Sequence, residues 1–408
     1  MSAADEAPVV IVGAGHGGGT LVGTLRQLGY EGPVVLIGSE PDAPYHRPPL
    51  SKKFHADELE DPLRPLEFYE EQGITLRLSE DVVAIDPEAR TVRLGDDTEL
   101  AYSTLVLATG AEPRRLPVPG GDLDGVVVLR TLADARVLKD AVHPDKRLVI
   151  VGAGYVGLEV AAVARSVGQQ VTVLEREDRV LARVASPELS EILTGHHVAQ
   201  GTEVLTSADV TGFAGDDDGH VRAVVLGDGR EIPCDLALVG VGAIPRDELA
   251  SAAGLTCDGG IVVDAATRTS DPHVLAIGDV TRRPVGNVEE LVRMESIPSA
   301  MEQAKQAAHV IVGKDVPAAD VPWFWSDQFD LKLKMAGLLR PGHAAVVRGD
   351  PTTGRFTVFH LDGDVIAAVE SANAPKEFMA GKKYIRTRQR VDVTRLADEA
   401  VGLKDVVA

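Results

Sequence analysis

The sequence predicts an α/β protein that contains two Rossmann-like domains and ends in a smaller α+β domain. A glycine-rich segment follows an apolar run at two places about 140 residues apart, and each time a helical pattern and a second apolar run come next. Beyond Pro322 the chain carries both tryptophans and then alternating apolar and polar segments, which predicts the last domain. With 408 residues, the chain is too long for one ordinary core.

Each Rossmann-like domain is expected to begin with a strand, a helix and a second strand. The predicted ranges in the first domain are Val9–Val12, Thr20–Leu28 and Val34–Ile37. Those in the second domain are Leu148–Val151, Val156–Val167 and Val171–Leu174. The distance between the two copies is far too long for a solenoid repeat and favours two similar domains.

Three further apolar runs are typical of buried parallel strands, and each is followed by a glycine where a ligand would meet the carboxyl end of the sheet. They are Thr104–Ala108 before Gly110, Leu236–Val241 before Gly242, and Val274–Ile277 before Gly278. We therefore expect one dinucleotide-binding domain in residues 1–113 and 244–321 and a second in 114–243. The α+β domain is expected in 322–408, with alternating strand patterns at Arg355–Leu361 and Val365–Val369.

The first glycine-rich segment, VVIVGAGHGGG, matches the dinucleotide fingerprint G-x-G-x-x-G. Gly13 permits the tight turn, Gly15 lets the backbone approach a pyrophosphate, and Gly18 lets the helix pack against the strand. The helix N-terminus would supply N–H groups to the phosphates. Glu40, just after the second strand, is placed to accept hydrogen bonds from an adenosine ribose.

The second segment, VIVGAGYVGLE, repeats this pattern with Gly152, Gly154 and Gly157. Its second strand ends at Glu175, where a carboxylate would accept from a ribose 2′-hydroxyl and repel a 2′-phosphate, so NADH is favoured over NADPH. Arg176 and Arg183 follow closely and could soften this preference. Two dinucleotide sites predict hydride transfer between a nicotinamide and a flavin, because a dehydrogenase with a single cofactor needs only one.

Composition excludes several other classes of protein. A net charge of −21 repels phosphate backbones and anionic lipid, so nucleic acid and membrane surfaces are not expected partners. The chain lacks a run approaching the ~20 apolar residues of a membrane span, and its start, MSAADEAP, lacks the features of a signal peptide, so a cytoplasmic protein is expected. Cys234 and Cys257 form no CxxC pair, and no metal-ligand cluster stands out.

Five segments together resemble the FAD-dependent ferredoxin reductases of the putidaredoxin reductase type, which have a glutathione reductase-like fold. They are PYHRPPLSK (44–52), STLVLATGAEPR (103–114), GYVGLE (154–159), VLAIGDV (274–280) and VPWFWSDQ (321–328). The rhodocoxin-type and biphenyl-dioxygenase-type reductases belong to the same group, and apoptosis-inducing factor is a more distant relative. The resemblance covers essentially the whole chain, in order.

The resemblance implies FAD at the first fingerprint and NADH at the second. The implied contacts to the adenosine half of FAD are Gly13, Gly15, Gly17 and Glu40 at the pyrophosphate and ribose and Val83 on the adenine side. Those implied at the flavin end are Arg47, Lys52, Ile297 and Trp325, and Asp279 would contact the ribityl chain. Further FAD contacts are implied for Ala108, Thr109, Gly110 and Arg130. His16, Gly18, Ser39 and Gly278 complete the FAD candidates; a solvent-facing His16 is the simpler expectation, and Ser39 stands where some relatives carry the ribose acid. The NAD candidates are Gly152, Gly154, Tyr155, Val156, Gly157, Glu159, Glu175, Arg183 and Gly242.

Lys52, Glu159 and Trp325 are the candidate catalytic residues. In the relatives the matching lysine lies beside the flavin N5 edge and pairs with the matching glutamate. Such an ammonium would help to hold the anionic reduced flavin, although a purely structural ion pair is the alternative. Trp325 would lie close to the nicotinamide, whereas Trp323 is expected to serve in packing.

The segment around Lys52 lacks the redox cysteine of related disulfide, peroxide and coenzyme A disulfide reductases. Electrons are therefore expected to pass from FAD directly to a two-iron two-sulfur ferredoxin, with two ferredoxins reduced per NADH. Ferredoxins of this kind are acidic, so a basic patch is expected to dock the carrier. Its candidates are Lys305, Lys382, Lys383 and Arg386, and the two-residue spacing of Arg386, Arg388 and Arg390 could place those arginines on one face of a strand; an ordinary solvated face is the alternative.

The leading hypothesis is an NADH:ferredoxin reductase that feeds a haem-thiolate monooxygenase or a ring-hydroxylating dioxygenase. Two alternatives stay open. One is a rubredoxin reductase, and the other is a slow flavoprotein that acts mainly as a binding partner, as apoptosis-inducing factor does.

Overall fold

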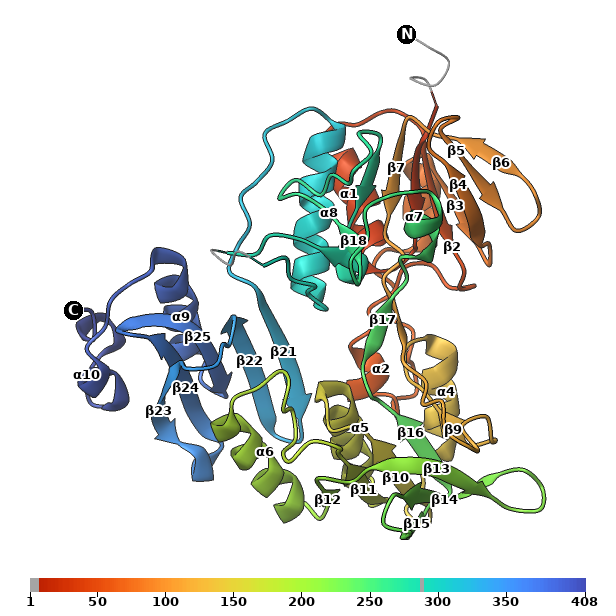
Figure 1. Ribbon diagram of the computed structural model, residues 1–408. Coiled ribbons are helices and arrows are strands. Elements are labelled where there is room, and N and C mark those ends of the chain that lie inside the picture. The colour runs from red at the N-terminus through yellow and green to blue at the C-terminus, as the bar shows by residue number, and fades with distance from the viewer. Residues whose placement is uncertain (1–6, 287–289) are drawn as a thin grey trace. The chain divides into compact units, whose positions relative to one another are not determined.

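The computed structural model describes residues 7–286 and 290–408, which form two compact units (Figure 1). One unit comprises Met1–His46, Glu60–Glu112 and Ile244–Pro322, and the other comprises Arg47–Leu59, Pro113–Ala243 and Trp323–Ala408. The short strands β8 (Ala111–Pro113) and β17 (Ala243–Pro245) lie where the chain passes from one unit to the other. Most of the N-terminal segment from which no targeting signal was expected, residues 1–6, lies outside the described residues.

The first unit is built on a parallel five-stranded sheet in the order β19-β7-β1-β2-β3. Its strands are β1 (Val9–Val12), β2 (Val34–Gly38), β3 (Ile74–Leu78), β7 (Thr104–Leu107) and β19 (Val274–Ala276). A second sheet contains β4 (Val82–Asp86), β5 (Thr91–Leu94) and β6 (Glu99–Ala101), and β18 (Ile261–Val262) pairs with β20 (Thr281–Arg282). The helices are α1 (His16–Gln27), α3 (Leu66–Glu71), α7 (Glu248–Ala252), η1 (Gly278–Val280) and α8 (Ile297–Ile311).

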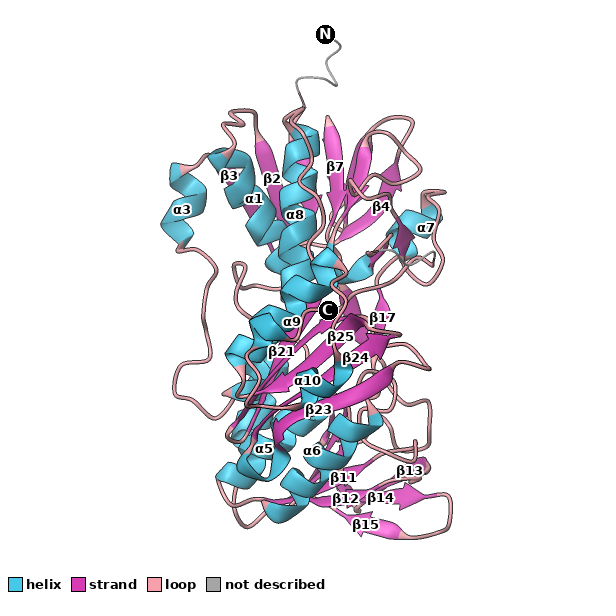
Figure 2. Cartoon of the chain, turned by 90° about the vertical axis from the view of Figure 1, so that its left-hand side faces the viewer, coloured by secondary structure: helices cyan, strands magenta, loops and turns pink. Residues whose placement is uncertain are grey.

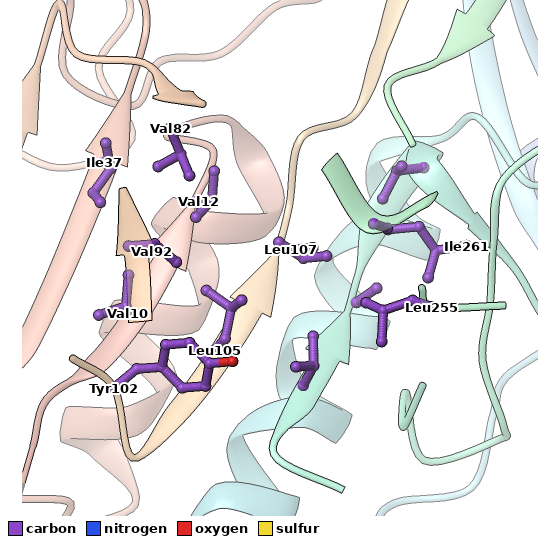
Figure 3. Close-up of a cluster of buried hydrophobic side chains, with 14 of the residues drawn as sticks. Val10, Val12, Ile37, Val82, Val92, Tyr102, Leu105, Leu107, Leu255 and Ile261 are labelled. Atoms are coloured by element: carbon purple, nitrogen blue, oxygen red, sulfur yellow. The ribbon is translucent and has the colours of Figure 1, made fainter. Parts of the chain in front are cut away.

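Both faces of the parallel sheet are buried, because successive side chains of each strand point to opposite faces. Val10 and Val12 of β1 pack into a core shared with β4, β5 and Leu105 (Figure 3). Val9 and Ile11 of the same strand face the other core, which α1 and α8 cover. The continuous apolar run at Val9–Val12 therefore reflects burial on two sides.

The second unit contains a parallel sheet of the same kind in the order β12-β11-β10-β16-β9. Its strands are β9 (Val126–Val127), β10 (Arg147–Val151), β11 (Gln170–Leu174), β12 (Glu203–Leu205) and β16 (Leu236–Val239). An antiparallel sheet is formed by β13 (Val210–Gly215), β14 (Val221–Leu226) and β15 (Glu231–Pro233). The helices of this part are α2 (Pro49–Lys52), α4 (Leu132–Ala141), α5 (Tyr155–Ser166) and α6 (Pro187–Ala199).

The last part of the second unit is an antiparallel sheet in the order β21-β22-β25-β24-β23 (Figure 2). Its strands are β21 (Trp323–Gln328), β22 (Leu331–Gly337), β23 (Ala344–Asp350), β24 (Arg355–Asp362) and β25 (Val365–Ala372). Helix α9 (Pro375–Thr387) packs against β22 and β25, and α10 (Val393–Ala397) packs against β23. Two short 3-10 helices, η2 (Pro351–Thr353) and η3 (Leu403–Asp405), complete this part.

The predicted fold class is confirmed: two parallel sheets with βαβ connections precede a C-terminal α+β part. Helix α1 begins at His16, directly after the glycine turn and before the predicted Thr20. The reason is that His16–Gly19 adopts helical geometry in spite of its three glycines, since the turn at Gly13 and Gly15 already directs the chain into the helix. The domain boundaries near residues 113, 243 and 321 stay a prediction.

Candidate active site

The glycine loop of the first unit has the geometry that a dinucleotide pyrophosphate requires. Gly13 has a φ of +118°, and a Cβ there would overlap the carbonyl oxygen of Ala108. A Cβ at Gly18 would overlap the carbonyl oxygen of Gly13, so this glycine lets α1 approach the loop. A Cβ at Gly15 would meet no atom within 4 Å, which leaves the backbone beside the start of α1 open to a ligand. The close contacts at Gly13 and Gly18 thus require glycine, whereas the approach of a pyrophosphate to Gly15 stays a prediction.

The end of β2 supplies the acidic group expected beside a ribose. Glu40 follows the strand and accepts a hydrogen bond of 2.5 Å from the Tyr45 hydroxyl, which orients its carboxylate. Ser39 is exposed next to it. His16 is buried, and its Nε2 lies 3.3 Å from Nδ1 of His46. The expectation of a solvent-facing His16 is therefore wrong, because the first turn of α1 is covered by the segment that carries His46.

The other FAD candidates of the first unit follow the carboxyl ends of its strands. Ala108, Thr109 and Gly110 come directly after β7, and the Thr109 hydroxyl donates to the carbonyl of Arg246 over 2.7 Å. Gly278 and Asp279 follow β19 in η1. Val83 lies in β4 with an exposed side chain, and Ile297 is the first residue of α8. The carboxyl ends of β1, β7 and β19 thus share one edge of the sheet.

The glycine loop of the second unit repeats these features. Gly152 has a φ of +103°, and a Cβ there would overlap the carbonyl oxygen of Gly240. A Cβ at Gly157 would overlap the carbonyl oxygen of Gly152, whereas a Cβ at Gly154 would meet no atom within 4 Å. The backbone is again open at one glycine only, at the N-terminus of α5. The same fit to a pyrophosphate therefore arises twice in the chain.

Glu175 directly follows β11, which ends one residue earlier, at Leu174, and lies beside this second loop. Its Oε2 accepts a hydrogen bond of 2.8 Å from the N–H of Ala153, and its Oε1 accepts one of 3.0 Å from the N–H of Glu177. A carboxylate can accept further donors at both oxygens, so a ribose diol remains compatible with these contacts. Arg183 is exposed, and its guanidinium would lie 3.5 Å from a Cβ at Gly242.

Tyr155 and Val156 begin α5. Val156 is exposed, whereas the Tyr155 ring makes an edge contact with Phe324 at a centroid distance of 4.9 Å. Burial raises the pKa of the Tyr155 hydroxyl well above its ordinary value, and within the described residues this oxygen has no hydrogen-bond partner.

Lys52 and Glu159 form a buried ion pair in the second unit. Nζ of Lys52 lies 2.5 Å from Oε1 of Glu159, and their side chains are 13% and 3% exposed. Ser326 donates to the same oxygen over 2.6 Å, and Ser51 donates to Oε2 over 2.5 Å. Desolvation would make either charge costly by itself, so the pair and its two hydroxyl donors stabilise one another. The sequence expectation that these two residues pair is matched by this geometry.

Strand β21 presents different residues on its two faces. Phe324, Ser326 and Gln328 point to one face, toward Tyr155, Glu159 and His197 of α5 and α6. On the opposite face, the Trp323 and Trp325 rings lie 5.8 Å apart by centroid, and Trp323 also packs against Phe378. Trp323 therefore packs, as expected.

Four FAD candidates belong to the second unit: Arg47, Lys52, Arg130 and Trp325. Nη1 of Arg47 donates to the carbonyl of Arg130 over 2.5 Å, which brings two of them together. The remaining FAD candidates belong to the first unit, and all the NAD candidates belong to the second.

Comparisons with known proteins identify the family of the chain. The model of the pyridine nucleotide-disulphide oxidoreductase family matches residues 7–304, and that of the reductase C-terminal domain matches residues 323–407. The chain belongs to the pyridine nucleotide-disulphide oxidoreductase family.

Several known proteins are similar to this chain over nearly its full length. It is 46% identical over 397 residues to a probable ferredoxin reductase of Castellaniella defragrans, covering 96% of this chain and 97% of that protein. It is 41% identical over 415 residues to putidaredoxin reductase of Pseudomonas putida, covering 100% and 98%. The crystal structure of the covalent putidaredoxin reductase–putidaredoxin complex matches with a TM-score of 0.94 at 40% identity, covering 98% of both chains.

Membership of this oxidoreductase family implies FAD and a nicotinamide dinucleotide as cofactors. The residues present fit both, because each unit has one glycine loop with an open backbone position at a helix N-terminus and an acidic residue after the next strand. Among the described residues, no helix is long and apolar enough to cross a membrane.

The predicted strand at 381–390 is wrong. Residues Pro375–Thr387 form α9, so Lys382, Lys383 and Arg386 follow helical spacing. Arg388 caps the helix with a φ of +50°, and Arg390 pairs with Asp364 over 2.6 Å. The basic residues do not alternate with apolar ones, as they would in a half-buried strand. Phe378, Gly381 and Tyr384 are buried and lie three residues apart. This helical spacing was the feature from which the helix could have been predicted.

Sequence reasoning missed four polar residues near the ion pair. They are Ser51, Ser326, Gln328 and His197. A signal existed for two of them: within WFWSDQ, Ser326 and Gln328 lie two residues apart in a strand and so share a face. Their burial depends on α5 and α6, which pack onto that face.

Proposed function

We propose that the protein is an NADH-dependent, FAD-containing ferredoxin reductase that passes electrons from NADH through FAD to a two-iron two-sulfur ferredoxin. The observation that carries the proposal is the presence of two dinucleotide loops of matching geometry, at Gly13–Gly18 and Gly152–Gly157. Hydride transfer between nicotinamide and flavin needs two such sites. The names of the relatives, reductases of ferredoxin and putidaredoxin, support the class of carrier.

The proposal extends to the place of the enzyme in an electron-transfer chain. We expect the reduced ferredoxin to feed a haem-thiolate monooxygenase or a ring-hydroxylating dioxygenase. The relatives include reductase components named for benzene and anthranilate dioxygenase systems, which supports this class of acceptor. The enzyme is proposed to act in the cytoplasm, where NADH is available.

The residues of the chain have distinct parts in the proposed reaction. Bound FAD supplies the ability to accept two electrons together and to release them singly. Backbone N–H groups at the starts of α1 and α5 bind the phosphates, and Glu40 and Glu175 accept from the ribose hydroxyls. The Lys52 ammonium, held by Glu159, places a positive charge at the flavin end, and the partly exposed Trp325 lies on the same face of β21 as Trp323.

The two thiols have properties that support direct transfer to a protein carrier. Cys234 is buried, and burial raises its pKa to about 12. Burial also raises the pKa of the half-buried Cys257 thiol. Because the thiolate is the reactive form, neither cysteine is suited to relay electrons as a redox thiol.

The proposed docking surface on the second unit consists of Lys382, Lys383 and Arg386 on α9. Positions 382 and 386, and positions 383 and 386, are one helical turn apart, so the three cations share one side of the helix. Lys383 and Arg386 are exposed, while Nζ of Lys382 lies 5.3 Å from the centre of the Trp323 ring. Lys305, exposed on α8 of the first unit, is proposed as a further contact. The protein is acidic as a whole, so such a local patch would select an acidic carrier.

A steady-state assay tests the proposed function. The purified FAD-loaded protein is mixed with NADH and cytochrome c, with a two-iron two-sulfur ferredoxin, with rubredoxin or with no carrier. We expect NADH oxidation to depend on the ferredoxin and two ferredoxins to be reduced per NADH. Faster transfer to rubredoxin would assign the protein to that carrier. Slow transfer to both, with rapid ferricyanide reduction, would contradict a reductase role and favour a binding flavoprotein.

A further inference from the structure

We propose that His197, Gln328 and Ser326 form a one-way hydrogen-bonded chain that positions Glu159 and, through it, the Lys52 ammonium. The inference deepens the proposed function and rests on the assignment of Lys52 to the flavin end. His197, Gln328 and Ser326 are positioning residues in this scheme, since they act on the cofactor site only through Glu159.

The hydrogen-bonded chain runs without a break from His197 in α6 to Glu159 in α5. Nε2 of His197 lies 2.9 Å from Oε1 of Gln328. Nε2 of Gln328 donates to the Ser326 hydroxyl over 3.1 Å, and that hydroxyl donates to Oε1 of Glu159 over 2.6 Å. The three positioning residues are each at most 1% exposed, so water does not compete for these contacts.

Every hydrogen bond in the chain points toward Glu159. A glutamine amide donates only from its nitrogen, and this nitrogen is committed to Ser326. The amide oxygen facing His197 must therefore accept, and Nε2 of His197 must carry a proton. Aligned donors polarise one another in a buried network, so each strengthens the next toward the carboxylate.

The same geometry argues against a proton wire. A relay has to pass a proton through each member in turn, and the Gln328 amide has no readily exchanged form that could do so. At the far end, burial lowers the pKa of His197 to about 4, so the ring is neutral near pH 7 and has no extra proton to pass on. Its Nδ1 has no hydrogen-bond partner within the described residues. The chain therefore orients a carboxylate and does not supply protons.

The opposite oxygen of Glu159 is held from a different direction. Ser51, next to Lys52 in α2, donates to Oε2, while the chain and Lys52 both reach Oε1. With both oxygens bound, the carboxylate plane cannot rotate without losing a donor. A fixed carboxylate plane also fixes the direction from which Glu159 holds the Lys52 ammonium.

Three variants of the FAD-loaded protein test the chain. Gln328→Met keeps the length of the side chain and removes its hydrogen bonds, and Glu159→Gln weakens the end of the chain. Thr194→Val is the matched control, because Thr194 is on α6 one turn before His197 and its hydroxyl donates only to the carbonyl of Ser190 in its own helix. The readouts are the rate of flavin reduction by NADH in anaerobic stopped flow and the midpoint potential of bound FAD, measured by equilibration with a redox dye.

We expect Gln328→Met to slow flavin reduction roughly fivefold, the loss expected for one neutral hydrogen bond. The midpoint potential of bound FAD should become more negative in Gln328→Met, because a displaced Lys52 ammonium stabilises the reduced cofactor less. Thr194→Val should match the parent protein in both readouts. In the Glu159→Gln background, Gln328→Met should have no further effect, since it acts through that carboxylate.

Two results would overturn the inference: unchanged rate and potential in Gln328→Met, or effects of Gln328→Met and Glu159→Gln that multiply. If Gln328→Met fails to fold, Ser326→Ala replaces it, and Ser326→Thr should recover the parent values by restoring the hydroxyl. Failure of the proposed function would look different, because the unaltered protein would then not be reduced by NADH while the potentials would still report on the chain.

Discussion

The Ser186 hydroxyl donates to Oε2 of Glu370 over 2.5 Å, and both residues are buried. Oε1 of Glu370 also accepts from the Ser186 N–H over 3.0 Å, and Nε2 of His360 lies 2.9 Å from Oε2. Ser186 is the N-cap of α6, whereas Glu370 and His360 lie in β25 and β24. One carboxylate thus joins the parallel-sheet part of the second unit to its antiparallel sheet.

Removing the charge of Glu370 should weaken that junction. We expect Glu370→Gln to lower the stability of the second unit by roughly 3 kcal/mol, because an amide nitrogen would face donors in a buried site. Thermal unfolding followed by circular dichroism should show a lower midpoint. Glu399→Gln, which breaks an exposed pair with Arg355, is the control and should cost less than about 1 kcal/mol. Equal effects of both variants would contradict the junction.

The stability of the second unit should fall in mild acid because of His197. Its pKa is about 4 in the folded protein and 6.5 in the unfolded chain, so the unfolded state binds more protons between these values. The neutral ring thus contributes fully above pH 6.5, and roughly 3 kcal/mol is lost as the pH falls through this window to about 4. Urea unfolding from pH 8 to pH 4.5 should show a steeper loss in the parent protein than in His197→Gln. Parallel curves would show that His197 does not titrate in this way.

Glu175 should set the choice between NADH and NADPH. We expect Glu175→Ala to raise the ratio of kcat/KM for NADPH to that for NADH by roughly tenfold or more, since the repulsion of a 2′-phosphate is removed. The KM for NADH should also rise, because the N–H of Ala153 loses its acceptor. Glu177→Ala is the control, because Glu177 lies two residues from Glu175 and its side chain pairs with the adjacent, exposed Arg176. An unchanged preference in Glu175→Ala would disprove the ribose assignment.

Charge reversal on α9 should weaken ferredoxin binding specifically. We expect Lys383→Glu with Arg386→Glu to raise the KM for ferredoxin several-fold and to flatten its dependence on salt, leaving NADH–ferricyanide turnover unchanged. Arg222→Glu with Arg230→Glu makes the same change in net charge on exposed residues of the β14–β15 hairpin, so it controls for the overall field. If both pairs act alike, α9 is not the docking surface.

The local parts of both dinucleotide sites could be predicted from the sequence, whereas the surroundings of the ion pair could not. Gly13, Gly18, Gly152 and Gly157 are required by the backbone of a turn only a few residues long, so a short motif specifies their geometry. The helix at Lys382 was missed because its apolar face, which includes Phe378, is short and polar residues dominate the segment. The burial of His16 was missed because the side chain that contacts it, His46, is 30 residues away.

By itself the sequence determined two βαβ dinucleotide folds, the acidic residue after each second strand, the absence of a thiol beside Lys52, and a resemblance to the ferredoxin reductases. These features depend on neighbours in the chain or on residue identity alone. Only the tertiary structure decided that Ser51, Ser326, Gln328 and His197 gather around Lys52 and Glu159. The physical reason is that these residues come from separate elements of the chain, and their contacts exist only once α5, α6 and β21 have packed together.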